Sequence, residues 1–560
     1  MNGKPSAVLS EAERHKLVSS PVDGKGLMLL FEAGLTWLTT NQQHVNSLNV
    51  FPVPDGDTGT NMVLTMQAAY NEAETQQTEN IGEMAHAIAQ GALMGARGNS
   101  GVILSQIWRG FARALNHYDT MDSALFVRAL QEARNTAYKG VVRPVEGTIL
   151  TVIKDMTAAA EEAAKNDASM SAVLAEIVRA GDESVKRTPE LLPILKQAGV
   201  VDSGGTGLFY IFEGMLRLIE GKPLDVSNAV VKPLSEMELA NTLENIEEGQ
   251  DYEVVIDFAP REQFSLDNYY AGLSDIGTSI QVGEGDGIYR MHIHVPLDKR
   301  YTPIEYTESL GTIKKIAMEN LQEQVNSRKN EKETIKLAQV TPGQVAVVAV
   351  SPGEGLSRIF ASLGVAAIVS GGQTMNPSVK EIVAAFENLP TDKIIILPNN
   401  KNIILAAQNA AKVSVKNIVV IPTHNAPQGF AAMLRLIPDG TLEENEEAMR
   451  EAIEEVHTGE ITTSTRDVTI DDVKVAKGDV IAMLDGKLIL STHSVEEATL
   501  ELLEKAKPDD YERVTFFYGE GMTPSAVNQI VDQVREKFSD VEIEVHEGGQ
   551  PYYQLIIAIE

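Results

Sequence analysis

The 560-residue sequence has no cysteine and far fewer basic than acidic residues. Without cysteine there is no disulfide, no thiolate nucleophile and no thiolate metal ligand, so a bound metal would need oxygen or imidazole ligands. Lysine and arginine total 47 against 79 for aspartate and glutamate, a formal net charge of -32. This charge argues against nucleic acid or an anionic membrane surface as the main partner, because both attract a basic surface.

Long hydrophobic runs are also absent. No segment approaches the roughly 20 apolar residues that span a bilayer, and the first residues are polar, without the apolar core of an export signal. We therefore expect no membrane insertion and a cytoplasmic location. A chain of 560 residues is too long for one hydrophobic core, which predicts about three or four domains.

The first part of the chain has a helical pattern. Across residues 26–219, apolar residues recur at spacings of three and four, for example over residues 84–94 and 123–137, and short glycine-rich joints separate the segments. This pattern predicts an all-α domain over residues 1–222. A polar, acidic linker is expected over residues 223–250.

Strand patterns dominate the rest of the chain. Residues 251–322 contain short runs rich in β-branched and aromatic residues with helical stretches between them, which predicts a small α+β domain, followed by a charged linker over residues 323–340. Over residues 341–560, apolar runs such as 345–350 and 393–397 alternate with helical segments and end in Gly, Pro or Asn turns. This alternation is typical of a parallel α/β sheet.

One segment near the N-terminus places two aspartates, Asp55 and Asp57, on a turn that opens a helix. Mg²⁺ binds a few carboxylates together with water and phosphate oxygens, so this pair suits a metal that also holds a nucleotide. A helix that begins near Thr60 and Asn61 would add free backbone N–H groups and the positive end of its dipole, and both attract phosphate. We expect this turn to be exposed to solvent.

Two further glycine-rich turns stand at predicted helix starts. Glycines there expose backbone N–H groups, and neighbouring polar side chains add hydrogen bonds. Their candidate ligand-binding residues are Gly98, Asn99, Ser100, Gly101, Asp202, Gly204 and Gly205. Each turn alone is also typical of a plain helix cap. Three such turns in one helical domain favour a phosphate-binding site.

The three motifs, in this order, resemble the nucleotide loops of the DhaL-type ATP-binding domain of dihydroxyacetone kinases. The whole chain is similar to the fatty acid kinase A family of bacteria. In that family a DhaL-like domain precedes a middle domain and a C-terminal domain that resembles DegV-type fatty-acid-binding proteins. Residues 370–378 and 422–429 account for the resemblance in the C-terminal part.

The resemblance implies a barrel of antiparallel helices that binds ATP at one end, with two Mg²⁺ ions bridging its phosphates. Asp55 and Asp57 would be metal ligands, and Asn49 is the polar residue nearest to the position of a third family aspartate. Asp202 would belong to the loop that covers the nucleotide. Residues around the phosphates would be Thr60, Asn61, Ser100 and Gly101.

Other candidate residues lie outside these loops. Arg143 could neutralise charge in the transition state, with a surface salt bridge as the alternative. His292 and His294 stand two apart on a predicted strand, so both rings project from one face and could bind zinc or position a phosphate. The family resemblance implies a cysteine as third member of that site, where this chain aligns Glu253, and two half-exposed strand histidines are the alternative. His424 is a weaker candidate.

These observations lead to the hypothesis of an ATP-dependent kinase that phosphorylates a fatty acid carboxylate presented by a separate DegV-like carrier. The product would be an acyl phosphate for phospholipid synthesis. The substrate follows from the family resemblance alone, which also implies a homodimer. Two alternatives stay open, namely a kinase of dihydroxyacetone (glycerone) or a similar small ketose, and a non-catalytic lipid-binding scaffold regulated by nucleotide.

Overall fold

The computed structural model describes residues 21–49, 56–165, 169–224, 232–233, 251–261, 264–285, 288–320, 335–373, 375–470, 473–507 and 511–560. Asp55 lies outside these ranges. Most of the two predicted linkers, over residues 223–250 and 323–340, also lies outside them.

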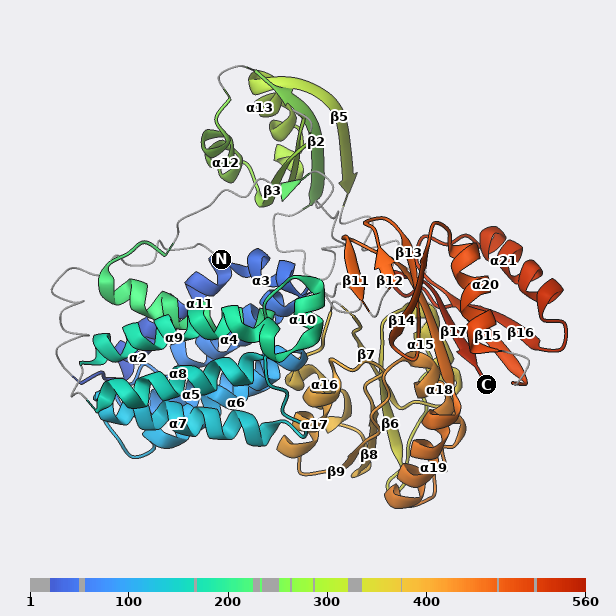
Figure 1. The fold of residues 1–560 in the computed structure, drawn as a ribbon. Helices are drawn as coiled ribbons and strands as arrows, with labels where there is room; N and C mark the ends of the chain where they lie inside the picture. The colour runs from blue at the N-terminus through green and yellow to red at the C-terminus, as the bar shows by residue number, and fades with distance from the viewer. Residues whose placement is uncertain are drawn as a thin grey trace. The chain divides into compact units, whose positions relative to one another are not determined.

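The chain forms two compact units (Figure 1). One unit combines the N-terminal residues 1–226 with the C-terminal residues 336–560, and the other contains residues 227–335. The N-terminal and C-terminal parts of the chain therefore pack together, although a separate unit lies between them in the sequence. Within the described residues, no helix is both long enough and apolar enough to cross a membrane.

The N-terminal part of the first unit is all-helical, as predicted. Short polar side chains cap several of its helix starts; Asp23, for example, accepts a hydrogen bond from the Gly26 N–H. The apolar faces of the helices share one core. The helices are α2 (Gly24–Thr40), α3 (Gln42–Leu48), α4 (Thr58–Glu74), α5 (Ile81–Gly95), α6 (Gly98–Leu115), α7 (Ser123–Gly140), α8 (Ile149–Ala164), α9 (Met170–Leu191), α10 (Pro193–Ala198) and α11 (Ser203–Glu220).

The second unit is a small α+β fold, which confirms the predicted class. Its strands form one sheet in the order β1-β3-β4-β2-β5, in which β5 pairs antiparallel with β2 and was not predicted. The elements are β1 (Lys232–Pro233), β2 (Tyr252–Pro260), α12 (Leu266–Ser274), β3 (Thr278–Gly285), β4 (Ile288–Val295), the short 3-10 helix η2 (Leu297–Lys299), α13 (Thr302–Leu310) and β5 (Gly311–Asn320).

Alternation along β2 and β4 gives this sheet two different faces. Val254 and Ile256 of β2 and Ile293 of β4 are fully buried in the core, together with residues of α12. Because successive strand residues point to opposite faces, His292 and His294 project from the other face of β4. The sheet therefore holds both imidazoles on the face away from the main core.

The C-terminal part of the first unit begins with a parallel four-stranded sheet, in the order β7-β6-β8-β9. This confirms the predicted parallel sheet, and its strands coincide with the predicted apolar runs to within a residue or two. The elements are β6 (Ala346–Ser351), α15 (Glu354–Ser362), β7 (Ala367–Ser370), α16 (Val379–Glu387), β8 (Lys393–Leu397), α17 (Ile404–Val413), β9 (Asn417–Val420), α18 (Ala426–Leu434) and α19 (Leu442–Glu455).

A second, mixed sheet of six strands completes this part, in the order β14-β13-β10-β17-β15-β16. Its pairs are antiparallel apart from β15 with β16, so the parallel pattern does not extend over the whole region. Strands β11 and β12 pair with each other as a separate antiparallel two-stranded sheet. The elements of this part are β10 (His457–Thr463), β11 (Val468–Ile470), β12 (Val473–Val475), β13 (Val480–Leu484), β14 (Lys487–Thr492), α20 (Val495–Ala506), β15 (Arg513–Tyr518), α21 (Pro524–Lys537), β16 (Glu542–Glu547) and β17 (Tyr553–Ile559).

The parallel sheet meets the helical part through the segments that follow its strands. Helix α16 packs against α5, and α17 packs against α6 (Figure 1). Residues 371–373 and 375–378, which follow β7, and the loop of residues 398–403, which follows β8, lie at the carboxyl edge of the sheet. In open α/β folds this edge is where ligand-binding loops gather.

Candidate functional site

The three sequence motifs of the helical part lie together in the structure. The Ser203 hydroxyl, at the start of α11, donates to the Thr58 hydroxyl at the start of α4, at 3.3 Å. Gly204 lies against the start of α6, because a Cβ added to it would be 3.5 Å from the Ser100 hydroxyl oxygen. Helices α4, α6 and α11 thus begin at one place.

Asp202 joins a fourth helix start to this group. Its carboxylate accepts a hydrogen bond from the Gly205 N–H at 2.6 Å and another from the backbone of Ile149, the first residue of α8. Burial raises the pKa of Asp202 to about 6, although both hydrogen bonds act to lower it. Asp202 thus satisfies one N–H group at the start of α11 and one at the start of α8. The positive dipole ends of the converging helices, and the N–H groups that helix starts leave without an intrahelical partner, make a setting for an anion.

Asp57 is the N-cap residue of α4, which begins two residues before the predicted start. Its carboxylate does not cap the helix. Oδ2 accepts a hydrogen bond from Asn376 Nδ2 at 2.6 Å, and Oδ1 lies 3.5 Å from Asn49 Nδ2. Asp57 is only 6% exposed, so the expected exposure of this turn is wrong for this residue. Asn376 of the C-terminal part contributes to this burial, because its side chain lies against the Asp57 carboxylate.

The loop before α6 is fixed by the same segment. Arg97 donates to the Asn376 backbone carbonyl at 3.0 Å and forms an ion pair with Glu381 of α16 at 3.1 Å. Next to it, Asn99 Nδ2 donates to Asn402 Oδ1 at 3.3 Å. The candidate phosphate loop therefore contacts both loops at the carboxyl edge of the parallel sheet.

Two features of position 98 require glycine, namely its backbone conformation and the close approach of neighbouring side chains. Its φ of +57° lies in the left-handed region that favours glycine. A Cβ there would be 2.7 Å from the Asn61 amide nitrogen and 3.5 Å from that of Asn376. The absence of a side chain lets both amides approach the backbone at the start of α6.

The residues at this place fit a nucleotide bound with Mg²⁺. The Oδ1 atoms of Asn99 and Asn376 are buried and have no hydrogen-bond partner among the described residues. Mg²⁺ prefers oxygen ligands, and phosphate prefers N–H donors at helix starts. A buried carboxylate at Asp57, amide oxygens and several helix starts provide both kinds of group.

Three candidate residues have other surroundings. Thr60 lies in the first turn of α4, but its hydroxyl accepts hydrogen bonds from Gln42 and Asn46, so its side chain faces α3. Arg143 is exposed in the loop before α8, and among the described residues it forms no ion pair, which leaves the salt-bridge alternative without support. His424 is exposed in the loop after β9.

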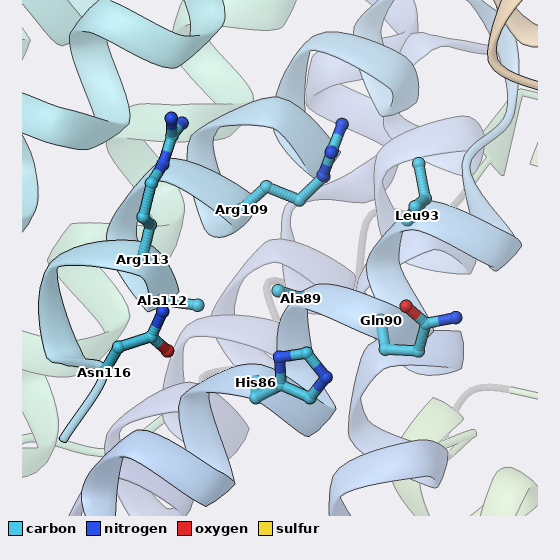
Figure 2. Close-up of a pocket in the computed structure, with 8 residues that line it drawn as sticks. All are labelled: His86, Ala89, Gln90, Leu93, Arg109, Ala112, Arg113 and Asn116. Carbon is cyan, nitrogen blue, oxygen red and sulfur yellow. The ribbon is translucent and has the colours of Figure 1, made fainter. Parts of the chain in front are cut away.

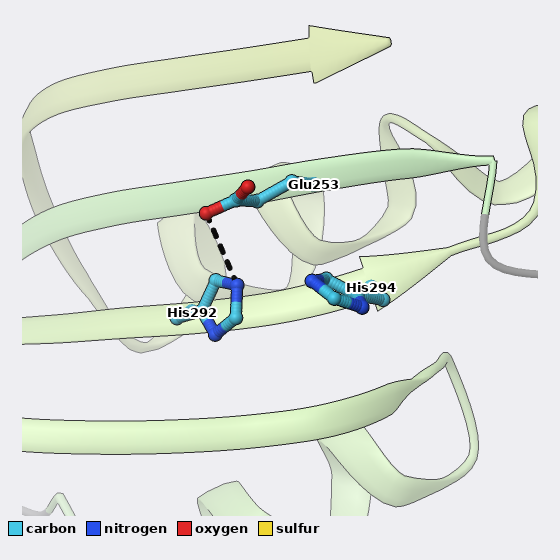
Figure 3. Close-up of side chains that lie close together, drawn as sticks. All are labelled: Glu253, His292 and His294. Atoms are coloured by element: carbon cyan, nitrogen blue, oxygen red, sulfur yellow. Dashed lines mark ion pairs between the residues drawn. The ribbon is translucent and has the colours of Figure 1, made fainter. Parts of the chain in front are cut away.

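The second unit contains a cluster of Glu253, His292 and His294 (Figure 3). His294 pairs with Glu253 in the antiparallel register of β2 and β4, and His292 Nε2 lies 3.1 Å from Glu253 Oε1. One ligand atom from each residue lies within 4.8 Å of the others. The histidines are 9% and 2% exposed, so the alternative of half-exposed strand histidines is wrong.

The charge states in this cluster suit a metal. Both ring nitrogens of His294 are buried without a hydrogen-bond partner among the described residues, and burial lowers the pKa of His294 toward the neutral form. Contact with His292 lowers the pKa of Glu253, which favours its carboxylate. Neutral imidazole and carboxylate are the forms that bind metal, and two nitrogens with one oxygen suit Zn²⁺ with an open position.

A groove of about 400 Å³ lies elsewhere, between α5 and α6 (Figure 2). His86 and Gln90 line it from α5, and Arg109 and Arg113 line it from α6. Arg109 donates to the Gln106 side chain at 3.0 Å. None of the residues predicted for the site lines this groove.

Sequence profiles of three domain families match successive parts of the chain. They are the DAK2 domain over residues 52–217, the middle domain of fatty acid kinase A-like proteins over residues 249–328, and the C-terminal domain of the same proteins over residues 346–560. Protein YloV of Bacillus subtilis is 38% identical over 552 residues, covering 96% of this chain and 99% of that protein. The chain belongs to the fatty acid kinase A-like family.

This fatty acid kinase A-like chain is also similar to a further relative and to several solved structures. A protein of Staphylococcus aureus is 37% identical over 551 residues, covering 97% of this chain and 100% of that protein. Among solved structures, the fatty acid kinase B3 protein of Streptococcus pneumoniae, loaded with linoleic acid, is 15% identical over 33% of this chain and 76% of its own, with a TM-score of 0.27. A DegV family protein of Thermus thermophilus, titled for fatty acid binding, is 14% identical over 39% of this chain and 99% of its own, with a TM-score of 0.30.

Sequence reasoning missed Asn376 and Arg97. Asn376 lies within residues 370–378, which carry part of the family resemblance, but nothing in that segment indicates contact with Asp57. The hydrogen bond between them joins residues 319 positions apart. Arg97 directly precedes Gly98 of the glycine-rich turn, and this position next to a candidate motif was the local signal that could have identified it.

Proposed function

We propose that this chain is an ATP-dependent kinase that phosphorylates the carboxylate of a fatty acid held by a separate carrier protein. The observation that supports phosphoryl transfer is the convergence of the starts of α4, α6, α8 and α11 beside the buried carboxylate of Asp57. Membership of the fatty acid kinase A-like family supports the substrate class.

In this proposal the residues divide into metal-binding and phosphate-binding groups. Asp57 and Asp55 would hold Mg²⁺, which neutralises phosphate charge when bound. The N–H groups at the starts of α6 and α11 would hold the phosphates, with Asn61, Ser100 and Gly101 beside them. Asp202 would fix the start of α11 against that of α8.

The proposed reaction needs no covalent protein group. A carboxylate oxygen of the fatty acid forms a bond to the γ-phosphorus while the bond from that phosphorus to the ADP oxygen breaks, which gives acyl phosphate and ADP. No proton has to move, so alignment and charge neutralisation are the main requirements. Arg143 is exposed on the loop before α8, where it would add positive charge once a carrier docks.

The second unit would contribute a metal centre. Glu253, His292 and His294 would hold a divalent transition metal such as Zn²⁺, as supported by the two buried imidazole nitrogens of His294 that lack partners among the described residues. This unit would dock the carrier or contact the fatty acid carboxylate. A glutamate in place of the family cysteine would keep the ligand set free of sulfur.

The test is an assay of the full-length protein with Mg²⁺, ATP, oleate and a DegV-type carrier from the same cell. Hydroxylamine traps acyl phosphate as a hydroxamate, and we expect carrier-dependent product. Asp57→Asn should lower the rate by about 100-fold or more, because it removes charge stabilisation at the phosphates. Asp23→Asn is the matched control, since Asp23 is also an N-cap aspartate of this helical part.

The outcomes separate the alternatives. Unchanged hydroxamate formation by Asp57→Asn would overturn the assigned site. Phosphorylation of dihydroxyacetone without carrier would favour the small-ketose kinase. The match to the DAK2 domain is the reason to test this substrate. Binding of Mg²⁺-ATP with no turnover on either substrate would favour the regulatory scaffold.

A further inference from the structure

A residue of the C-terminal part lies inside the candidate kinase site. Asn376 precedes α16 and is 2% exposed. Its Nδ2 donates to Asp57 Oδ2 at 2.6 Å, in a buried hydrogen bond. The same amide lies beside Gly98, at the start of α6. It therefore contacts two of the three motifs that form the site.

The backbone around Asn376 is held by contacts that do not use its side chain. Arg97 donates to its carbonyl at 3.0 Å and pairs with Glu381 at 3.1 Å. Ser378 and Glu381 form a capping box that fixes the start of α16. These contacts keep the amide over Asp57 whichever way the amide group itself is turned.

One atom of this amide is not used. Asn376 Oδ1 is buried and has no hydrogen-bond partner among the described residues, which is unfavourable for a carbonyl oxygen. A half-turn about the last side-chain bond exchanges Oδ1 with Nδ2. The oxygen would then face Asp57, where the N–H donor faces it now.

A cation at Asp57 would favour one of these two amide orientations over the other. When no cation is bound, the N–H donor is favoured next to the carboxylate, because the amide then hydrogen-bonds to Asp57. Next to a carboxylate that holds Mg²⁺, the N–H group is repelled and the amide oxygen is attracted, since Mg²⁺ binds carboxylate and amide oxygens. Asn376 Oδ1 therefore gains a binding partner near Asp57 only when a cation is present.

We propose that Asn376 completes the Mg²⁺-nucleotide site from the C-terminal part of the chain. It donates to Asp57 when no cation is bound, and it turns Oδ1 toward the cation when one is bound. This inference rests on the proposed function, because it requires Mg²⁺ at Asp57. As a consequence, nucleotide binding is linked to the packing of the parallel sheet on the helical part.

The test compares nucleotide affinity with and without Mg²⁺ in the full chain. Isothermal titration with a non-hydrolysable ATP analogue is done in Mg²⁺ and again in EDTA. Asn376→Ala should weaken binding by about 10- to 100-fold in Mg²⁺, the range found when groups that support a metal site are removed, and should have little effect in EDTA. Arg466→Ala is the matched control, because Arg466 also links the two parts, through the Ser47 carbonyl at 3.0 Å.

A second variant, Asn376→Asp, keeps the side-chain shape and adds a charge beside Asp57. In EDTA the two carboxylates repel each other, so the Tm should fall below that of wild type. Mg²⁺ should restore the Tm, because both carboxylates can then bind the cation. A residue with only a structural role would lower the Tm equally in both conditions.

Each outcome decides the matter. If Asn376→Ala matches Arg466→Ala in Mg²⁺, or loses the same affinity in EDTA as in Mg²⁺, the inference is overturned while the proposed function stands. If Mg²⁺ fails to restore the Tm of Asn376→Asp, the inference is also overturned. Wild-type protein that binds no nucleotide in the presence of Mg²⁺ would refute the proposed function itself.

Discussion

Replacing Asp202 by asparagine should stabilise the start of α11 at neutral pH. Burial raises the pKa of this carboxyl from its ordinary value of 3.8 to about 6, so its charged form is held at a cost. The pKa difference corresponds to about 3 kcal/mol, at 1.36 kcal/mol per pH unit. Because the side chain is half-buried, solvent screens part of this cost, and we expect a gain of about 1–3 kcal/mol. The asparagine oxygen can still accept from the Gly205 N–H, whereas weakening of the hydrogen bond from Ile149 offsets part of the gain and places it toward the lower end of this range.

The effect has a defined pH window. The folded-state pKa lies above the unfolded-state value, so the folded chain binds more protons between about pH 4 and pH 6, and the free energy of unfolding falls as the pH rises through this window. Asp202→Asn has no such titration. The two proteins should therefore be about equally stable near pH 4, and the variant should reach its full advantage above about pH 6.5.

Hydrogen exchange in peptides from α11 measures the local opening free energy, after correction for the pH dependence of intrinsic exchange. Asp122→Asn is the matched control, because Asp122 accepts from the Leu125 N–H at 2.8 Å at the exposed start of α7. There the lost charge removes only a favourable helix-dipole interaction of about 0.3–1 kcal/mol, so the sign is opposite. Destabilisation of α11 by Asp202→Asn above about pH 7, or an effect independent of pH, would refute the burial argument.

Three further predictions follow from the geometry. Gly98→Ala should lower the stability of the helical part by about 1–2 kcal/mol from its left-handed backbone alone, with a further loss from the 2.7 Å approach to Asn61; a thermal unfolding shift near zero would contradict this. His294→Ala should abolish zinc retention after dialysis, measured by elemental analysis, whereas Glu253→Gln should only weaken it; retention of zinc by His294→Ala would exclude this cluster as the site. Arg143→Ala should leave Mg²⁺-nucleotide affinity unchanged and lower carrier-dependent turnover, and a loss of nucleotide affinity instead would place Arg143 at the phosphates.

Local patterns in the sequence predicted the fold class well. Val347 and Val348 of β6 are both buried, and such two-sided burial is why this strand reads as a continuous apolar run. The glycine-rich turns do stand at helix starts, because glycine and polar caps act on their own neighbours in the chain. The periodicity of a segment does not indicate which strands pair with one another. The pairing of β5 with β2 and the strand order of the mixed second sheet therefore could not be predicted.

The candidate site was predictable only in its local pieces. Asp57, Gly98 and Asp202 were identified from short motifs, and three such motifs in one helical domain favoured a common site, but only the structure shows that the three helix starts lie together. The burial of Asp57 was not predictable from its own motif, because the side chain that hydrogen-bonds to it there, Asn376, lies 319 positions away in the sequence. A contact between residues so far apart produces no recognisable pattern of residue types in either segment.

The 319-residue separation between Asp57 and Asn376 also has a consequence during synthesis. At a translation rate of about 5–20 residues per second, Asn376 leaves the ribosome about 15–60 seconds after Asp57. In the later part of that interval, once α11 (Ser203–Glu220) has emerged, the nascent helical part has all of its helix starts but lacks Asn376. The growing chain thus passes through a stage in which the helix starts are complete and the hydrogen bond from Asn376 to Asp57 cannot yet form, and the emergence of Asn376 ends that stage.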